Sequence, residues 1–109
     1  MSDYMLGFCS CPDPETGREI AMALVERRLA ACVNVLPGVT SVYRWLGEVE
    51  HAEECLLVIK THWEAYAELE STIQELHPYE LPEVVAVNIE EGLPEYLAWI
   101  STNVEKTNE

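Results

Sequence analysis

The stretch HPYELPE, residues 77–83, places one imidazole, one phenol and two carboxylates on a short, stiff segment. Pro78 and Pro82 each fix their own φ angle, lack a backbone donor and disfavour a helical conformation in the preceding residue. Polar and aromatic groups on a stiffened loop favour a binding site. The alternative is that His77 and Tyr79 only cap and pack the end of a preceding helix.

Cys9, at the end of a predicted strand, is the second group with useful chemistry. If the chain stays extended, Cys11 points to the same side as Cys9. A thiol at this strand end could approach the loop that carries His77. Cysteine and histidine suit copper, zinc and other soft or borderline cations, although two ligands are too few for a structural site. The alternative for Cys9 is an ordinary buried thiol.

The other two cysteines, Cys32 and Cys55, fall in apolar surroundings and are expected in the core. No two cysteines form a CxxC pair, which excludes a zinc ribbon and a thioredoxin motif. The first ten residues begin with an acid and lack a basic segment followed by a long apolar one, so they do not resemble a signal peptide. We therefore expect reduced thiols and a cytoplasmic protein.

No arrangement of residues indicates an enzyme. The serines lack a G-x-S-x-G context, no glycine-rich phosphate loop is present, and no nucleophile–base–orienter triad is visible. His51 and His62 lie at predicted strand ends and are expected to be solvated. Lys60 ends an apolar strand and is expected to pair with a carboxylate or to face an anion, although a purely structural role explains it equally well.

Length and net charge limit the number of domains and the kinds of partner that this protein can have. A chain of 109 residues with 49% hydrophobic residues is expected to form one domain, residues 1–109, with a filled core. The formal net charge of −14 argues against partnership with nucleic acid and against docking on anionic lipid. No apolar run reaches the roughly 20 residues of a membrane span.

The pattern of apolar residues predicts strands and helices in a definite order. Helices are expected at residues 14–28 (with Asp13 as N-cap), at 63–76, and from Pro94 onward. Strands are expected at 4–9, 31–35 resuming at 39 after a bulge or a bend, 51–61 and 84–89. Gly17 early in the first helix has no explanation from sequence. Residues 105–109 are expected to fray.

This β-α-β-β-α-β order with a C-terminal helix indicates an α+β, ferredoxin-like fold, an antiparallel sheet with two helices on one face. The opposite face must then be polar or covered by something else. Tyr43 and Trp45, on the long central hairpin, are candidates for a subunit interface. The alternative is that they pack under the C-terminal helix of the same chain.

Five stretches together resemble the CutA family of divalent-cation-tolerance proteins. They are CSCPDPETGREIAMALV (9–25), LAACVNVLPGVTSVYRW (29–45), LLVIKTHWEAY (56–66), HPYELPE (77–83) and YLAWI (96–100). The resemblance implies a ferredoxin-like subunit in a tight homotrimer, with an architecture like that of the PII signalling proteins. It also implies binding of copper or another divalent cation, and no established reaction.

The ligands that the resemblance implies are a cysteine ending the first strand and one or two histidines before the Pro-Tyr pair. Cys9 and His77 match them, whereas Leu76 stands where some members carry a second histidine. Cys11, Glu80 or a neighbouring chain would have to supply the missing contact. The alternative function is a PII-like signalling module that binds a small molecule or a protein, an analogy at the level of fold alone.

Overall fold

The computed structural model describes residues 3–105. Its elements are β1 (Tyr4–Cys11), α1 (Pro14–Glu26), β2 (Cys32–Trp45), β3 (Glu48–His62), α2 (Trp63–Leu76), β4 (Val85–Asn88) and α3 (Pro94–Asn103). The predicted order is confirmed, and the limits of α2 agree with the prediction. β1 is two residues longer than expected, so that it includes Cys11. Apart from Glu105, the segment expected to fray lies outside the described residues.

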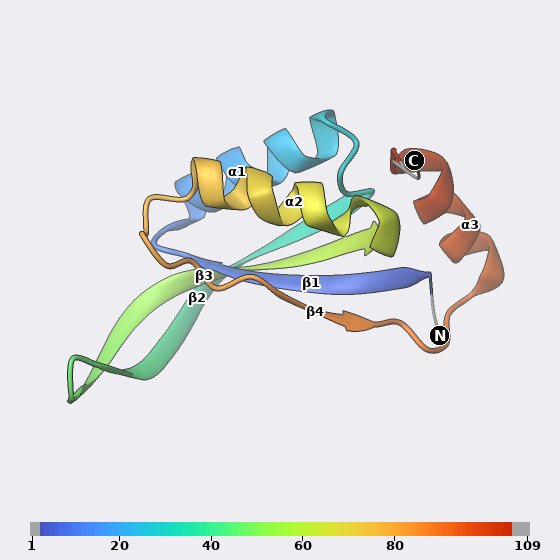
Figure 1. Cartoon of the computed structure of the whole chain (residues 1–109). Coiled ribbons are helices and arrows are strands. Elements are labelled where there is room, and N and C mark those ends of the chain that lie inside the picture. The colour runs from blue at the N-terminus through green and yellow to red at the C-terminus, as the bar shows by residue number, and fades with distance from the viewer. Residues whose placement is uncertain (1–2, 106–109) are drawn as a thin grey trace.

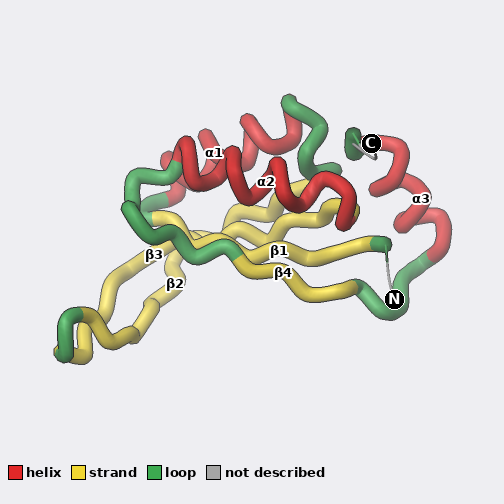
Figure 2. Tube along the Cα trace, in the orientation of Figure 1, coloured by secondary structure: helices red, strands yellow, loops and turns green. Residues whose placement is uncertain are grey.

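The four strands form one antiparallel sheet in the order β2-β3-β1-β4. Helices α1 and α2 lie side by side on one face of this sheet, and α3 lies beside one end of it (Figure 1). Within the described residues no element covers the opposite face, as the trace coloured by secondary structure also shows (Figure 2). We call this opposite face the open face. In the same range, no helix has the length and apolar character needed to cross a membrane.

The core fills the space between the helices and the sheet, because alternate residues of β1 and β3 point toward the helices. Its largest fully buried aliphatic members on the helices and on β3 are Ile20, Leu24, Leu57, Ile59, Leu69, Ile73 and Ile100. Cys9, Cys11 and Cys55 lie among them and are fully buried. The expectation that Cys55 belongs to the core is therefore confirmed.

Helix α1 begins where the sequence predicts. The Asp13 side chain accepts a hydrogen bond of 2.8 Å from the Thr16 backbone N–H, and Pro14 opens the helix. The structure also explains Gly17, which the sequence left unexplained. A Cβ carbon on Gly17 would lie 2.8 Å from Cys55 Sγ. Only a residue without a side chain lets α1 approach β3 this closely.

Strands β2 and β3 form a hairpin that extends well beyond the rest of the sheet, and α3 lies at the other end of the molecule (Figure 1). A bulge between Leu36 and Val39 interrupts their pairing, as predicted. Tyr43 and Trp45 are 42% and 53% exposed on this hairpin. The alternative that they pack under the C-terminal helix is therefore wrong.

Two expectations for side chains near β3 need correction. His62 is only 6% exposed, because the Tyr4 ring packs on it with 5.4 Å between centroids, and its Nδ1 atom accepts a hydrogen bond of 3.2 Å from Glu64 N–H and so caps α2. His51 is exposed, as expected. Cys32 is only partly buried, because it lies on the open face, where its Sγ atom is 3.9 Å from Lys60 Nζ.

Lys60 has neutral partners. Its ammonium group donates to the side-chain oxygen of Asn34 as well as contacting Cys32. Among residues 3–105 no ion pair joins Lys60 to a carboxylate. The expected pairing of Lys60 with an acid is therefore not observed in the described chain.

Candidate metal centre

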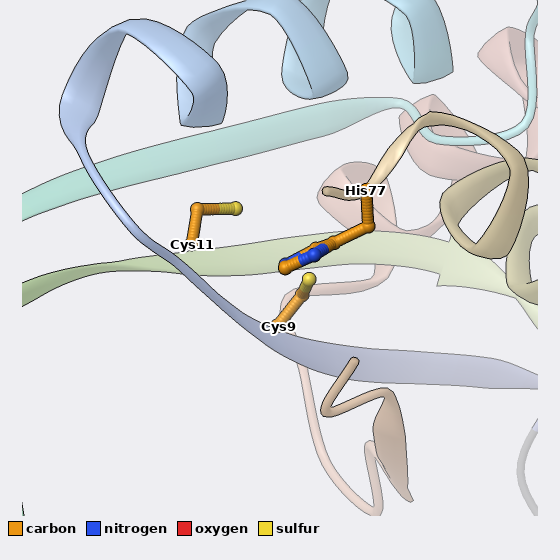
Figure 3. Close-up of side chains that lie close together, drawn as sticks. All are labelled: Cys9, Cys11 and His77. Carbon is orange, nitrogen blue, oxygen red and sulfur yellow. The ribbon is translucent and has the colours of Figure 1, made fainter. Parts of the chain in front are cut away.

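Cys9, Cys11 and His77 bring three potential metal-binding groups together inside the subunit. The two Sγ atoms and an imidazole nitrogen all lie within 4.8 Å of one another, and all three residues are buried. Figure 3 shows both thiols and the imidazole ring converging from β1 and from the loop after α2. The structure thus places Cys9 beside His77, as the sequence suggested, and adds Cys11.

The thiols converge because β1 is extended through residue 11. Cys9 and Cys11 are two positions apart on that strand, so both side chains point toward the helices. Opposite them on β3 lie Leu57 and Cys55 respectively. The two sulfur atoms therefore occupy an apolar layer, with no water-facing side.

His77 is placed by the end of α2. Its backbone N–H donates to the Ile73 carbonyl at 2.8 Å, which ends the helix, and its ring packs on the Tyr79 ring with 4.7 Å between centroids. The capping role considered from sequence is therefore real. Pro78 follows at once, so the chain leaves the helix in an extended conformation at His77.

Both ring nitrogens of His77 are hydrogen-bonded. Nε2 lies 2.7 Å from the Ser10 carbonyl oxygen, and Nδ1 accepts a bond of 3.1 Å from the Tyr79 N–H. Because a carbonyl oxygen only accepts, Nε2 must carry the proton and Nδ1 the lone pair. His77 is therefore a neutral ring that ties the 77–83 loop to β1. A metal ion can bind His77 only if one of these two bonds is given up.

The thiols of Cys9 and Cys11 shift each other's pKa. The pKa of Cys9 is raised well above its ordinary value, first by its hydrogen bond with Cys11 and then by burial. The same bond lowers the pKa of Cys11, although burial and the nearby carboxylates of Glu54 and Asp13 oppose this. Cys11 is therefore the thiol of the pair that ionises more readily. The Cys9 S–H donates to the Ser10 carbonyl, with 3.8 Å between sulfur and oxygen.

Two further hydrogen bonds anchor the loop. The Ser10 hydroxyl donates to the Glu83 carboxylate at 2.7 Å, and the Tyr79 hydroxyl donates to Glu54 at 2.8 Å. Glu80 is exposed and does not belong to the cluster of potential ligands, and Leu76 is 38% exposed. Of the substitute ligands within this chain that the sequence offered, the structure brings only Cys11 to the site.

A groove of about 900 Å³ lies between the hairpin and this loop. Its aromatic walls are Tyr43, Trp45 and Tyr79. The acidic side chains that line it are Glu50, Glu54, Glu80 and Glu83. Tertiary structure alone creates this groove, because the hairpin and the loop are far apart in sequence.

A family model, curated relatives and solved structures all match this chain and agree on one family. The model of the "CutA1 divalent ion tolerance protein" family matches residues 5–103. The divalent-cation tolerance protein CutA of Thermus thermophilus is 53% identical over 92 residues, which cover 84% of this chain and 89% of that protein. A solved structure of the divalent cation tolerance protein from Thermus thermophilus has a TM-score of 0.92 at 48% identity, covering 94% of this chain and 99% of that one.

More distant relatives agree. Protein CutA of Mus musculus is 43% identical over 101 residues, which are 93% of this chain but 57% of the mouse protein. The structure of the periplasmic divalent cation tolerance protein CutA from Archaeoglobus fulgidus has a TM-score of 0.91 at 37% identity, with 94% and 99% of the two chains covered. The resemblance seen in the sequence is thereby confirmed, and the chain belongs to the CutA1 divalent ion tolerance protein family.

Proposed function

We propose that this protein serves in the response to divalent metal ions by binding a soft or borderline cation, such as copper, at Cys9, Cys11 and His77. The observation that carries the proposal is the convergence of two thiols and one imidazole within 4.8 Å. Membership of a family named for divalent ion tolerance supports the same role. The role is one of binding and not of catalysis.

The chemistry of the donors selects the class of cation. Sulfur and imidazole ligands suit copper and zinc, whereas calcium and magnesium require oxygen ligands. A divalent ion needs His77 as a third ligand, and His77 must then release either the Ser10 carbonyl or the Tyr79 amide. Because this loss offsets part of the gain from coordination, we expect weak binding of divalent ions.

Binding must compete with protons. The thiols have to ionise, and the His77 nitrogen that becomes a ligand has to stay unprotonated. The raised pKa of Cys9 makes its proton the hardest to remove. Affinity should therefore fall steadily as the pH decreases.

Calorimetric titration with Zn²⁺, which does not oxidise thiols, tests the site. Wild type should bind, and Cys9→Ser and His77→Gln should both lose affinity. Cys32→Ser is the matched control, because Cys32 lies on the open face of the sheet. Equal binding by wild type and both site variants would assign the metal to the acidic surface and overturn the proposal.

We further propose that the subunit is ferredoxin-like and assembles as a homotrimer with a PII-like architecture. The strand order β2-β3-β1-β4 supports the first part. The open face supports the second, because an apolar row crosses it with Phe8 between Val58 and Val85. Val85 is 51% exposed in the single chain. Uncovered apolar surface of this kind marks a site of association.

A signalling or binding module is the second candidate function. The groove between the hairpin and the 77–83 loop favours it, because aromatic and acidic side chains line one concave surface. A thermal-shift screen of small molecules separates the two functions. A compound that raises the melting temperature equally in wild type and in Cys9→Ser acts at the groove and not at the thiols.

We propose a cytoplasmic location. All four cysteines are free thiols, which suits a reducing compartment. The Archaeoglobus fulgidus structure is described as periplasmic, however. Fractionation of cells that express the tagged protein, with compartment markers, decides between the two compartments.

A further inference from the structure

The hydrogen bonds around the metal centre distinguish its three potential ligands. His77 has both ring nitrogens engaged: Nε2 holds the 77–83 loop to Ser10 on β1, and Nδ1 accepts from the Tyr79 N–H within the loop. The Cys9 and Cys11 sulfur atoms lie within 4.8 Å of each other, and the Cys9 thiol makes a long hydrogen bond of 3.8 Å to the Ser10 carbonyl. A cation that displaces only thiol protons therefore leaves the loop anchored, whereas a cation that also needs the imidazole detaches one of its bonds.

The two sulfur atoms are close enough for one cation to bind both. At a metal–sulfur bond of about 2.3 Å, two sulfurs on opposite sides of one ion lie about 4.6 Å apart. The Cys9 and Cys11 Sγ atoms are within 4.8 Å of each other and project from the same side of β1. One cation can therefore contact both sulfur atoms from this side of the strand.

The surroundings disfavour a fuller coordination shell. Both thiols are fully buried members of the hydrophobic core, beside Leu57 on β3. No carboxylate of the described residues lies within the same 4.8 Å set. A four-coordinate Zn²⁺ would lack at least one ligand here, but a soft monovalent cation is satisfied by two thiolates.

We propose that Cys9 and Cys11 bind Cu⁺ between their two sulfur atoms, with His77 outside the coordination sphere. This inference rests on the proposed metal-binding function and specifies the charge of the cation and its ligands. Two S–H bonds break and two Cu–S bonds form, while both protons pass to solvent and no electron is transferred. His77 stays neutral and keeps its bonds to Ser10 and Tyr79.

The test uses the full reduced chain under anaerobic conditions. Cu⁺ is supplied as its acetonitrile complex and competed against a chromogenic Cu⁺ chelator. We expect one Cu⁺ per chain, and a loss of at least about 100-fold in affinity for Cys9→Ser and Cys11→Ser, since removing a ligand exceeds the 10–100-fold loss from an outer-shell partner. The control Cys32→Ser, on the open face of the sheet, should bind as wild type.

X-ray absorption on the Cu⁺-loaded wild type gives a readout that does not depend on variant folding. Two sulfur neighbours and no nitrogen support the inference. A nitrogen neighbour overturns it while leaving the proposed function standing. If Cys9→Ser binds Cu⁺ and Zn²⁺ as tightly as wild type binds them, the proposed function and this inference both fail.

Discussion

Gly17 of α1 lies directly against Cys55 of β3, and a Cβ carbon on Gly17 would stand 2.8 Å from the Cys55 sulfur and 3.3 Å from a Leu57 methyl group. Gly17→Ala should therefore destabilise the fold, even though alanine favours helices. Overpacking of this kind costs about 1–3 kcal/mol, against a gain of about 1 kcal/mol in helix propensity. Urea unfolding of the two proteins measures the difference.

A double variant provides the control. Cys55→Ala removes the sulfur atom that the new methyl group meets, so Gly17→Ala should cost less in that background than in wild type. If the cost is the same in both backgrounds, contact with the Cys55 sulfur is not the reason for glycine at this position.

Ile100 is the buried residue of α3 and belongs to the same core as β3. Ile100→Ala should cost about 2–5 kcal/mol and loosen α3, because it leaves a cavity. Trp99→Ala, on the 44% exposed neighbour, is the matched control and should cost less. Thermal melts of the variants compare them, and an equal loss in both would show that α3 is not held through Ile100.

The helices and strands follow from local pattern, because apolar periodicity, Asp13 as N-cap and the prolines all act on neighbouring residues. The expectation for His62 failed for a reason that the pattern does not contain. Its ring accepts the first free N–H of α2 and is covered by the Tyr4 ring, with centroids 5.4 Å apart. Burial of this kind depends on which elements meet, and so did the closeness of Gly17 to Cys55.

Ionisation of the Tyr79 hydroxyl should contribute to the pH dependence of the free energy of unfolding. The pKa of Tyr79 is raised to about 12, first by burial and then by the hydrogen bond to Glu54. An unfolded tyrosine ionises near pH 10, so between about pH 10 and 12 the folded chain holds a proton that the unfolded chain has lost. Stability should fall as the pH rises through this window.

Tyr79→Phe isolates this contribution, because Tyr66 and Tyr96 also have raised pKa values and act in the same direction. The variant should lose less stability than wild type between pH 9 and 12, as measured by urea unfolding. Tyr79 is 39% exposed, so solvent screening keeps the difference small. Parallel curves for the two proteins would refute the assignment.

The proposed trimer should depend on the open face and on the hairpin. Light scattering at low micromolar concentration should give three times the chain mass for wild type and less for Phe8→Glu, which places a charge in the apolar row. Trp45→Ala should weaken assembly, since truncating a large interface aromatic typically costs about 2 kcal/mol or more. Met22 is 60% exposed on the outer side of α1, so Met22→Glu should leave the mass unchanged.

A monomer mass for wild type at that concentration would refute the trimer. If Trp45→Ala leaves the dissociation of the trimer unchanged, the hairpin is not part of the interface, and only the open face of the sheet remains as a candidate.

Only part of the candidate metal centre could be predicted from the sequence. Residue type and strand alternation were enough to single out Cys9, His77 and the direction of Cys11. The two hydrogen bonds of His77 were not, because the Ser10 carbonyl is 67 positions away in the chain. Availability of a ligand depends on such partners, and no local pattern records them.

The inner and outer halves of the β2–β3 hairpin differ in the number of strands that pair with β3. β1 pairs with β3 only from Cys55 to His62, whereas β2 pairs with β3 as far out as Glu48. Residues 48–54 of β3 therefore have one neighbouring strand, and a two-stranded ribbon alone is only marginally stable. In a single chain the outer amide hydrogens should exchange with solvent by local opening, and the inner ones only on global unfolding. Slow exchange along residues 48–54 would then be a local signature of a second chain lying against the ribbon.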